Sequence, residues 1–182
     1  PDLLQRLVAV NARAVAAYLN EQIAAGADAV MLFDTWGGLL TTDAYRSFSL
    51  ASMRSVLAAL RPAPDGRRIP TIVFTKGGGQ WLDAIADCGA DCVGLDWTAD
   101  LADARRRVGA TVALQGNLDP LVLLTDVAVV AREAAAVVRA AGPAPGHIFN
   151  LGHGIVPATP PENVAALVEA VHRESGAGRA SA

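Results

Sequence analysis

Residues 29–38 read Ala-Val-Met-Leu-Phe-Asp-Thr-Trp-Gly-Gly, an apolar run that ends in a polar turn containing glycine. Because the run is apolar at every position, it predicts a strand covered on both faces, as in sheets of parallel strands. Four further runs of this kind occur at residues 71–74, 92–95, 112–115 and 147–150. The sequence therefore predicts five strands.

Helical patterns alternate with these strands. Apolar residues keep helical spacing from Leu3 to Ile23 and Gly26 follows as the stop, and further helices are expected at about 43–60, 80–87, 99–107, 126–140 and 161–174. The residues expected at helix ends are the N-caps Thr42, Thr98 and Thr125, the starting prolines Pro160 and Pro161, and the terminating glycines Gly89, Gly109 and Gly142. Strand alternating with helix predicts an α/β fold whose parallel strands follow sequence order, with right-handed crossovers and helices on one face.

The composition is typical of a soluble globular domain. The chain has 182 residues, of which 52% are hydrophobic and 18% charged, and its net charge is −3. No basic run indicates a nucleic-acid or anionic-membrane partner, since Arg105-Arg106-Arg107 suits the last turn of a helix. No stretch reads as a membrane span or signal peptide, so we expect a cytoplasmic protein. One domain over residues 1–175 is expected, followed by a flexible tail at 176–182.

Two further patterns concern the joins between helix and strand. Cys88 and Cys92 are spaced C-x₃-C, which is not the C-x₂-C of a zinc or redox site, and they are interpreted as reduced, buried thiols. Residues 25–30, Ala-Gly-Ala-Asp-Ala-Val, return in similar form at 88–93, Cys-Gly-Ala-Asp-Cys-Val. Both copies fall where a helix leads into a strand, which indicates a repeated structural unit.

Polar residues gather after each predicted strand, at residues 34–38, 75–79, 96–98, 115–120 and 150–154. In β/α barrels and open α/β sheets, ligand sites form at the carboxyl ends of the strands. Four of the five segments contain glycine, which lets a backbone approach a ligand closely. The sequence therefore predicts that several loops converge on one ligand.

The individual side chains leave alternatives open. Asp34 and Asp96 could accept hydrogen bonds from loop amides or contact a substrate. Lys76 could pair with a ligand carboxylate or with Asp96, and the ion pair is favoured. His153, between two glycines at a strand exit, indicates a ligand contact. Residues 77–79 are all glycine but lack the spacing of a nucleotide-binding loop, and His147 and His172 are interpreted as structural or solvated.

Five of these segments resemble the uroporphyrinogen decarboxylase family in its proteobacterial form. They occur in family order as far as Ser175, and they read Phe-Asp-Thr-Trp-Gly-Gly (33–38), Phe-Thr-Lys-Gly-Gly-Gly-Gln-Trp-Leu (74–82), Gly-Leu-Asp-Trp-Thr (94–98), Ala-Leu-Gln-Gly-Asn-Leu-Asp-Pro (113–120) and Gly-His-Ile-Phe-Asn-Leu-Gly-His-Gly (146–154). The resemblance implies a (β/α)₈ barrel and a homodimer. It also implies a decarboxylase without cofactor or metal that removes four acetate carboxyls from uroporphyrinogen III, giving coproporphyrinogen III in haem biosynthesis.

The resemblance carries roles to two positions. Thr35 matches a hydroxyl residue that contacts the substrate, and His153 matches a histidine that binds a substrate carboxylate. Lys76, Asp96, Gln115 and Asn117 fit the family motifs as supporting residues, and no catalytic residue is assigned. The reaction needs a protonated pyrrole as electron sink for the departing carboxylate, together with cationic groups for the other carboxylates.

The resemblance covers the second, larger part of the family, from the helix before the fourth strand. The arginine-rich loop, the aspartate under the pyrrole NH groups and the tyrosine near the acetate have no counterpart here, and a complete barrel takes ~250 residues. We therefore expect the 182 residues alone to be inactive. Two alternatives remain: a non-catalytic half-barrel, and a related cobalamin- or thiol-dependent methyltransferase, which would need zinc ligands at strand exits.

Overall fold

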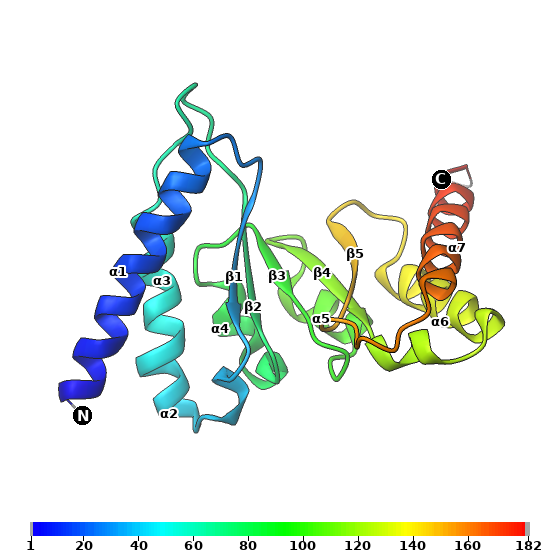
Figure 1. Cartoon of the computed structure of the whole chain (residues 1–182), viewed down its shortest axis with the longest axis horizontal. Helices are drawn as coiled ribbons and strands as arrows, with labels where there is room; N and C mark the ends of the chain where they lie inside the picture. The colour runs from blue at the N-terminus through cyan, green and yellow to red at the C-terminus, as the bar shows by residue number, and fades with distance from the viewer. Residues whose placement is uncertain (1, 181–182) are drawn as a thin grey trace. The chain divides into compact units, whose positions relative to one another are not determined.

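The structure is a computed structural model that describes residues 2–180, with side chains described to residue 176. The chain forms two compact units, Pro1–Val93 and Gly94–Ala182. Five strands follow one another in sequence order in the sheet, β1-β2-β3-β4-β5, and the pairs β1–β2 and β4–β5 are parallel (Figure 1). The predicted α/β fold with parallel strands in sequence order is confirmed.

The first unit begins with α1 (Asp2–Ala24), which leads into β1 (Val30–Asp34). A short turn η1 (Gly37–Leu39) and a helical stretch follow, and β2 (Thr71–Thr75) pairs with β1 in a register that sets Asp34 opposite Thr75. The turn η3 (Gly78–Trp81) and helix α4 (Leu82–Ala86) then lead to β3 (Cys92–Gly94), where the units divide. The core of this unit contains Ala16, Leu19, Ile23, Val30, Val56, Ala63 and Ile69.

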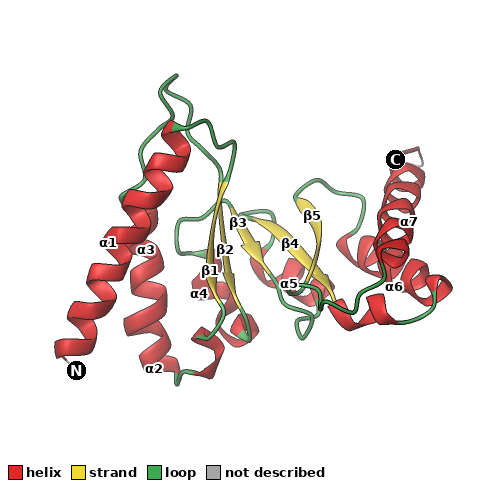
Figure 2. Cartoon of the chain, in the orientation of Figure 1, coloured by secondary structure: helices red, strands yellow, loops and turns green. Residues whose placement is uncertain are grey.

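The second unit continues with α5 (Leu101–Val108) and β4 (Ala113–Leu118). The turn η4 (Pro120–Leu124), helix α6 (Val127–Ala141), strand β5 (His147–Leu151) and helix α7 (Pro161–Ala180) complete it. Figure 2 shows α6 and α7 side by side, and their apolar faces meet in a core of Leu118, Leu123, Val130, Ala134, Leu167 and Ala170.

The helix predicted at 43–60 is present but not uniform. It consists of α2 (Thr42–Ala44), the π-helical stretch η2 (Tyr45–Leu50) and α3 (Ala51–Ala58). π-Helical turns inside helices are frequent at functional sites. Here the π-helical stretch carries Tyr45 and Ser49, two residues that bond to the ends of β1 and β2.

The three predicted N-caps are wrong. Thr41, Asp100 and Asp126 precede the helices, and of these only the Asp100 side chain caps, accepting the amide of Asp103 at 2.6 Å. The Thr98 hydroxyl donates instead to Asp96, and the Thr125 hydroxyl to the Val122 carbonyl. The threonines are displaced from the N-cap positions: Thr42 is the first residue of α2, and Thr98 and Thr125 lie two residues and one residue before Asp100 and Asp126.

Three other predicted helix ends agree with the structure, whereas α4 ends at Ala86, three residues before Gly89. Pro161 starts α7, and Gly109 and Gly142 follow α5 and α6 with φ of 59° and 78°, a backbone region open to glycine. Arg105-Arg106-Arg107 forms the last turn of α5, as predicted. Arg105 also donates to the carbonyls of Gly109, Val112 and Gly146 at 2.7–3.0 Å, so it ties the amino ends of β4 and β5 together.

The repeated hexapeptide lies at two helix-to-strand joins, as predicted. Its two aspartates meet neighbouring arginines: Asp28 lies 3.6 Å from Arg67, and Asp91 lies 2.6 Å from Arg68. Asp91 also accepts the amide and hydroxyl of Thr71 at 2.8 and 3.0 Å, whereas Asp28 is largely exposed. The two copies of the hexapeptide therefore occupy the same kind of join, but their aspartates make different contacts.

The last helix is longer than the helix predicted at 161–174, because α7 continues to Ala180. The predicted end of the domain at residue 175 stays a prediction. Residues 181–182 of the predicted tail lie outside the described residues, and its flexibility stays a prediction. Across residues 2–180, no helix is long and apolar enough to cross a membrane.

Candidate active site

The loop after β1 is organised around the carboxylate of Asp34. Asp34 Oδ1 accepts the amide of Gly37 at 2.8 Å, and Oδ2 accepts the hydroxyl of Ser49 from η2. The Asp34 carbonyl accepts the amide of Lys76, the first residue after β2, at 3.1 Å. Asp34 therefore accepts a loop amide, which is one of the two roles left open for it, and its contact with a substrate stays a prediction.

Thr35 follows Asp34 directly, at the carboxyl end of β1, where the resemblance predicts a substrate contact. Its side chain is half-buried, and no hydrogen bond of its hydroxyl is found to the side chains described, which end at residue 176, or to the backbone of residues 2–180. The neighbouring Trp36 is 72% exposed and Leu39 is 79% exposed. The loop after β1 thus presents a hydroxyl and two apolar side chains to whatever approaches it.

Behind this loop lies a polar cluster that the sequence analysis missed. Tyr45 is fully buried, its hydroxyl lies 2.9 Å from Thr75 Oγ1, and its ring stacks on Trp81 at 3.9 Å between centroids. Burial raises the pKa of Tyr45 to about 12, and the nearby charge of Asp34 acts in the same direction. Trp81 Nε1–H donates to the Thr42 hydroxyl at 3.1 Å. The available signal was the spacing of Tyr45 and Ser49, four residues apart in a helical segment.

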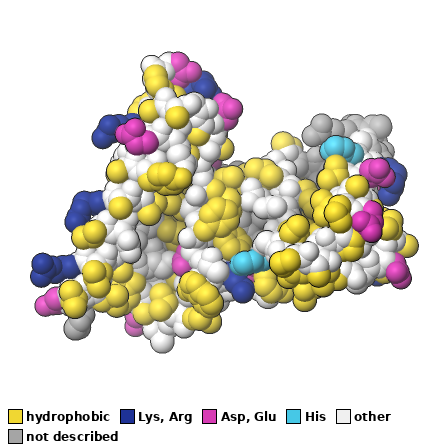
Figure 3. All heavy atoms as spheres, in the orientation of Figure 1, with side chains coloured by type: hydrophobic (Ala, Val, Ile, Leu, Met, Phe, Trp, Pro, Cys, Tyr) yellow, Lys and Arg dark blue, Asp and Glu magenta, His cyan; other side chains and the backbone are white. Residues whose placement is uncertain are grey.

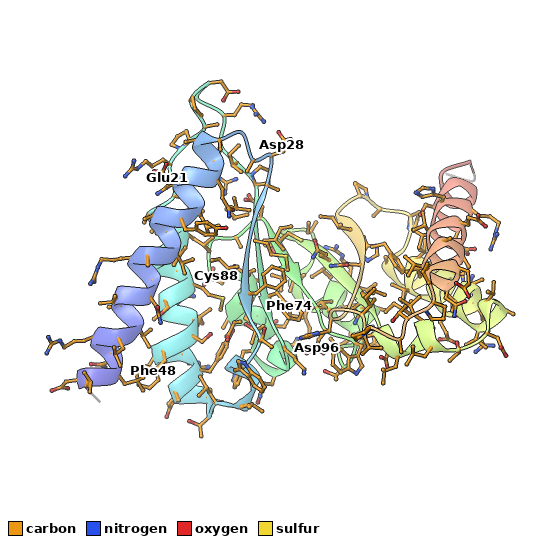
Figure 4. The ribbon with its side chains drawn as sticks, in the orientation of Figure 1. Glu21, Asp28, Phe48, Phe74, Cys88 and Asp96 are labelled. Carbon is orange, nitrogen blue, oxygen red and sulfur yellow. The ribbon has the colours of Figure 1, made fainter. Side chains whose placement is uncertain are left out.

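In the second unit, Asn117 holds the loop after β3. Its side-chain amide, buried in β4, donates to the carbonyls of Asp96 and Ala99 at 2.8 and 2.7 Å. Asp96 is buried, and its Oδ1 accepts the Thr98 amide at 2.8 Å; Figure 4 labels this residue. Asn117 therefore supports the loop by bonding to two carbonyls of the turn that begins at Asp96.

His153 follows β5 and is exposed. Its ring meets the Trp97 ring edge-on, with centroids 6.1 Å apart. A Cβ at Gly152 would lie 2.3 Å from the Trp97 amide nitrogen, so only glycine fits where this loop crosses the β3 exit. Trp97 and Gly152 together determine where the imidazole of His153 stands.

The other residues singled out in the sequence are two histidines, a glutamine of β4 and a lysine–aspartate pair. His147 Nε2 lies 2.8 Å from the Gly116 carbonyl oxygen, and burial lowers the pKa of His147. His172 is exposed on α7. Gln115 is buried in β4, and the ion pair predicted between Lys76 and Asp96 stays a prediction.

Zinc-dependent thiol chemistry would need clustered ligands. Cys88 and Cys92 are free and buried, as expected of structural thiols, and burial raises the pKa of the Cys88 thiol. Within the described residues, no group of three or more His, Cys, Asp or Glu side chains is placed to hold a metal ion.

The outer strand of each pair is the more exposed one. Phe33 of β1 is 70% exposed, whereas its register partner Phe74 of β2 is 6% exposed. Ile148 of β5 is 46% exposed, whereas Gln115, its partner in β4, is buried. Beside β1 an open apolar groove of about 570 Å³ runs between α1, β1 and the η2–α3 stretch; Phe48, labelled in Figure 4, lines it. Figure 3 shows hydrophobic side chains exposed along α1 on the same unit.

The parallel strands in sequence order, the alternating helices and the polar strand exits define an α/β chain of the (β/α)₈-barrel type. A solved structure described as a methyltransferase from Methanosarcina mazei matches it with a TM-score of 0.80 over 94% of this chain and 50% of that one. The sequence identity is 24%, so this likeness shows the fold alone.

Residues 1–174 match the family model of uroporphyrinogen decarboxylase, and the chain belongs to this family. Relatives named uroporphyrinogen decarboxylase are 61% identical in Dechloromonas aromatica and 58% identical in Cupriavidus necator and Paraburkholderia xenovorans. The matches cover 98%, 96% and 100% of this chain but 51%, 49% and 50% of the relatives. The chain thus spans about half the length of the curated relatives it matches, over their carboxyl-terminal portion.

Proposed function

We propose that this chain is the carboxyl-terminal part of a decarboxylase that converts uroporphyrinogen III to coproporphyrinogen III. The observation that carries the proposal is the family match over residues 1–174, together with relatives of that name at 58–61% identity. In each step a ring carbon of the pyrrole accepts a proton, and the electrons of the breaking C–CO₂⁻ bond flow into the resulting cation. Carbon dioxide leaves, a second proton completes the methyl group and the ring proton is returned.

Thr35 and His153 are the substrate contacts that this chain contributes. The Thr35 hydroxyl has no competing partner among the described residues, and it can donate to a carboxylate. The exposed His153 can hold another carboxylate through an N–H, more strongly when protonated. No residue is proposed as the proton donor, and no cofactor or metal is invoked.

We expect activity to require the segment that the relatives have and these residues do not contain. The exposed strand β1 and the apolar groove beside it leave surface that a neighbouring strand and helix would cover. The chain alone is expected to aggregate or oligomerise and to lack turnover. A homodimer of the complete protein and a cytoplasmic location belong to the same proposal, the latter supported by two buried free thiols.

The test is coexpression of the chain with the amino-terminal half of the Dechloromonas aromatica relative. The purified pair is incubated anaerobically with uroporphyrinogen III, and coproporphyrin is quantified by fluorescence after oxidation. We expect turnover by the pair and none by the chain alone. When this chain carries His153→Ala, the pair should lose most of its turnover and keep its unfolding midpoint. His172→Ala on α7 is the matched control, and the pair that carries it should keep both.

Two results would contradict the proposal. A folded, stable pair without turnover would refute the activity. Turnover by the 182-residue chain alone would refute the claim that the missing segment is needed. Sedimentation velocity on the active pair tests the dimer.

A further inference from the structure

Both carboxylate oxygens of Asp34 are used within the protein. Oδ1 accepts the amide of Gly37, three residues ahead, and Oδ2 accepts the hydroxyl of Ser49, fifteen residues ahead. The first bond closes the loop that contains Thr35, and the second joins that loop to the η2 segment. Asp34 is therefore a link between the loop and the helical wall behind it.

A buried donor chain supports this link. Thr75 Oγ1 lies 3.5 Å from Asp34 Oδ2, and the Tyr45 hydroxyl lies 2.9 Å from Thr75 Oγ1. Because a carboxylate only accepts, the threonine hydroxyl points toward Asp34 and the tyrosine hydroxyl toward the threonine. The stacking of Tyr45 on Trp81 leaves the tyrosine ring little freedom.

The loop packs without free space around these bonds. A Cβ at Gly37 would lie 1.9 Å from Asp34 Oδ2, and one at Gly38 would lie 2.1 Å from the Lys76 carbonyl oxygen. Turn bonds from the Leu39 amide to Trp36 and from the Leu40 amide to Gly37 complete the loop at 3.1 and 3.0 Å. The polypeptide from 34 to 40 is thus held at both ends and at its middle.

Thr35 lies inside this held loop, and its own hydroxyl has no partner among the described residues. We infer that Asp34 is a positioning residue, which with Ser49 fixes residues 35–38 so that the Thr35 hydroxyl is presented in one orientation. This inference rests on the proposed function, because the group to be met by Thr35 is a carboxylate of the porphyrinogen. Displacement of a substrate-binding group by about 1 Å can cost about a hundredfold in rate.

The first test is a double-mutant cycle on the coexpressed pair, with Asp34→Asn, Thr35→Val and the double variant. The carboxamide that Asp34→Asn introduces keeps an acceptor for Gly37 but turns an NH₂ group toward the Ser49 and Thr75 hydroxyls. We expect each single variant to lower kcat/KM about tenfold or more, and the double variant to be no worse than the poorer single one. Asp43→Asn, the same change at an exposed position of α2, is the control and should leave kcat/KM unchanged.

The second test is hydrogen exchange on the coexpressed pair, measured without substrate. In Asp34→Asn, the amides of Gly37, Leu39 and Leu40 should exchange about tenfold faster or more, while the Lys76 amide, bonded to the Asp34 backbone, keeps its rate. Ser49→Ala should shift the same three amides in the same direction and serves if Asp34→Asn folds poorly.

The two tests separate the claim that Asp34 holds the loop from the claim that it acts on the substrate through Thr35. Multiplying losses in the cycle would show that Asp34 acts independently of Thr35 and would overturn the inference. Unchanged exchange at Gly37, Leu39 and Leu40, or equal acceleration of every amide, would overturn it as well. A folded wild-type pair without turnover would overturn the proposed function and the substrate claim with it, whereas the exchange result alone decides whether Asp34 holds the loop.

Discussion

The loops after β1 and β3 each begin with an aspartate that accepts a loop amide, but they are joined to neighbouring elements in opposite ways. In the first unit, the loop's own aspartate reaches outward, from Asp34 to Ser49 on η2. In the second, an amide reaches in from the next strand, from Asn117 to the carbonyls of Asp96 and Ala99. A carboxylate collects amide and hydroxyl donors, whereas a carboxamide nitrogen satisfies carbonyls. Loops that occupy equivalent places after parallel strands therefore need not be stabilised by the same chemistry.

Both units contain a glycine whose Cα lies close to the backbone of another loop. We expect replacement of either glycine to have the largest effect on the free energy of unfolding. A Cβ at Gly38 would lie 2.1 Å from the Lys76 carbonyl oxygen, and one at Gly152 would lie 2.3 Å from the Trp97 amide nitrogen. Because the obstructing atoms are backbone, Gly38→Ala and Gly152→Ala should each lower the free energy of unfolding by about 3 kcal/mol or more. Urea unfolding followed by tryptophan fluorescence measures this.

The matched control is Gly154→Ala, where a Cβ would have no atom within 4 Å. Its unfolding free energy should stay within about 0.5 kcal/mol of the wild type. A loss below about 1 kcal/mol in Gly38→Ala or Gly152→Ala would mean that the loop concerned moves aside easily.

The amide of Asn117 should have the next largest effect. Asn117→Leu keeps the approximate size of the side chain but leaves the carbonyls of Asp96 and Ala99 without their donor. Unsatisfied buried groups cost about 1–3 kcal/mol, so we expect a loss of about 2 kcal/mol in the same assay. Asn150→Leu, on an exposed residue of β5, is the control. Equal effects of the two substitutions would contradict the role assigned to Asn117.

The smallest effect concerns pH and the histidine of β5. Burial lowers the pKa of His147 in the folded protein, so the unfolded chain binds a proton more readily. Stability should therefore fall as pH drops through the ordinary histidine pKa near 6.5, by less than about 1.4 kcal/mol per pH unit. Unfolding midpoints at about pH 7.5 and about pH 5.5 should differ less in His147→Gln than in the wild type. The same pH dependence in both proteins would exclude this histidine as the cause.

Several particular elements could be predicted because their causes are local. The apolar run at 29–33 predicts β1, and Gly109 and Gly142 mark where α5 and α6 end. The joins at 25–30 and 88–93 were recognisable because the same short pattern connects helix to strand in both. The five motifs were enough to identify the family. The roles of Thr35 and His153 stay predictions.

The failures of prediction occur where a hydroxyl bonds to a partner that the helix pattern does not include. Thr98 and Thr125 looked like N-caps, but their hydroxyls bond to Asp96 and to the Val122 carbonyl. Tyr45 and Ser49 lie within the helix predicted at 43–60 and were not singled out, although they belong to the polar cluster behind the β1 loop. In each case the sequence shows the hydroxyl that donates, but it does not show which oxygen accepts the hydrogen bond.

The sequence by itself determined the order of strands and helices, the family and the positions at which polar loops follow strands, because apolar periodicity and turn chemistry act over a few residues. The tertiary structure alone decided that Asp34 would bond to Ser49, that Asn117 would hold the turn at Asp96, and that only glycine would fit at 38 and 152. These contacts join segments 15 to 55 residues apart. Their partners are chosen by packing, and packing exists only once the strands have paired and the helices have covered them.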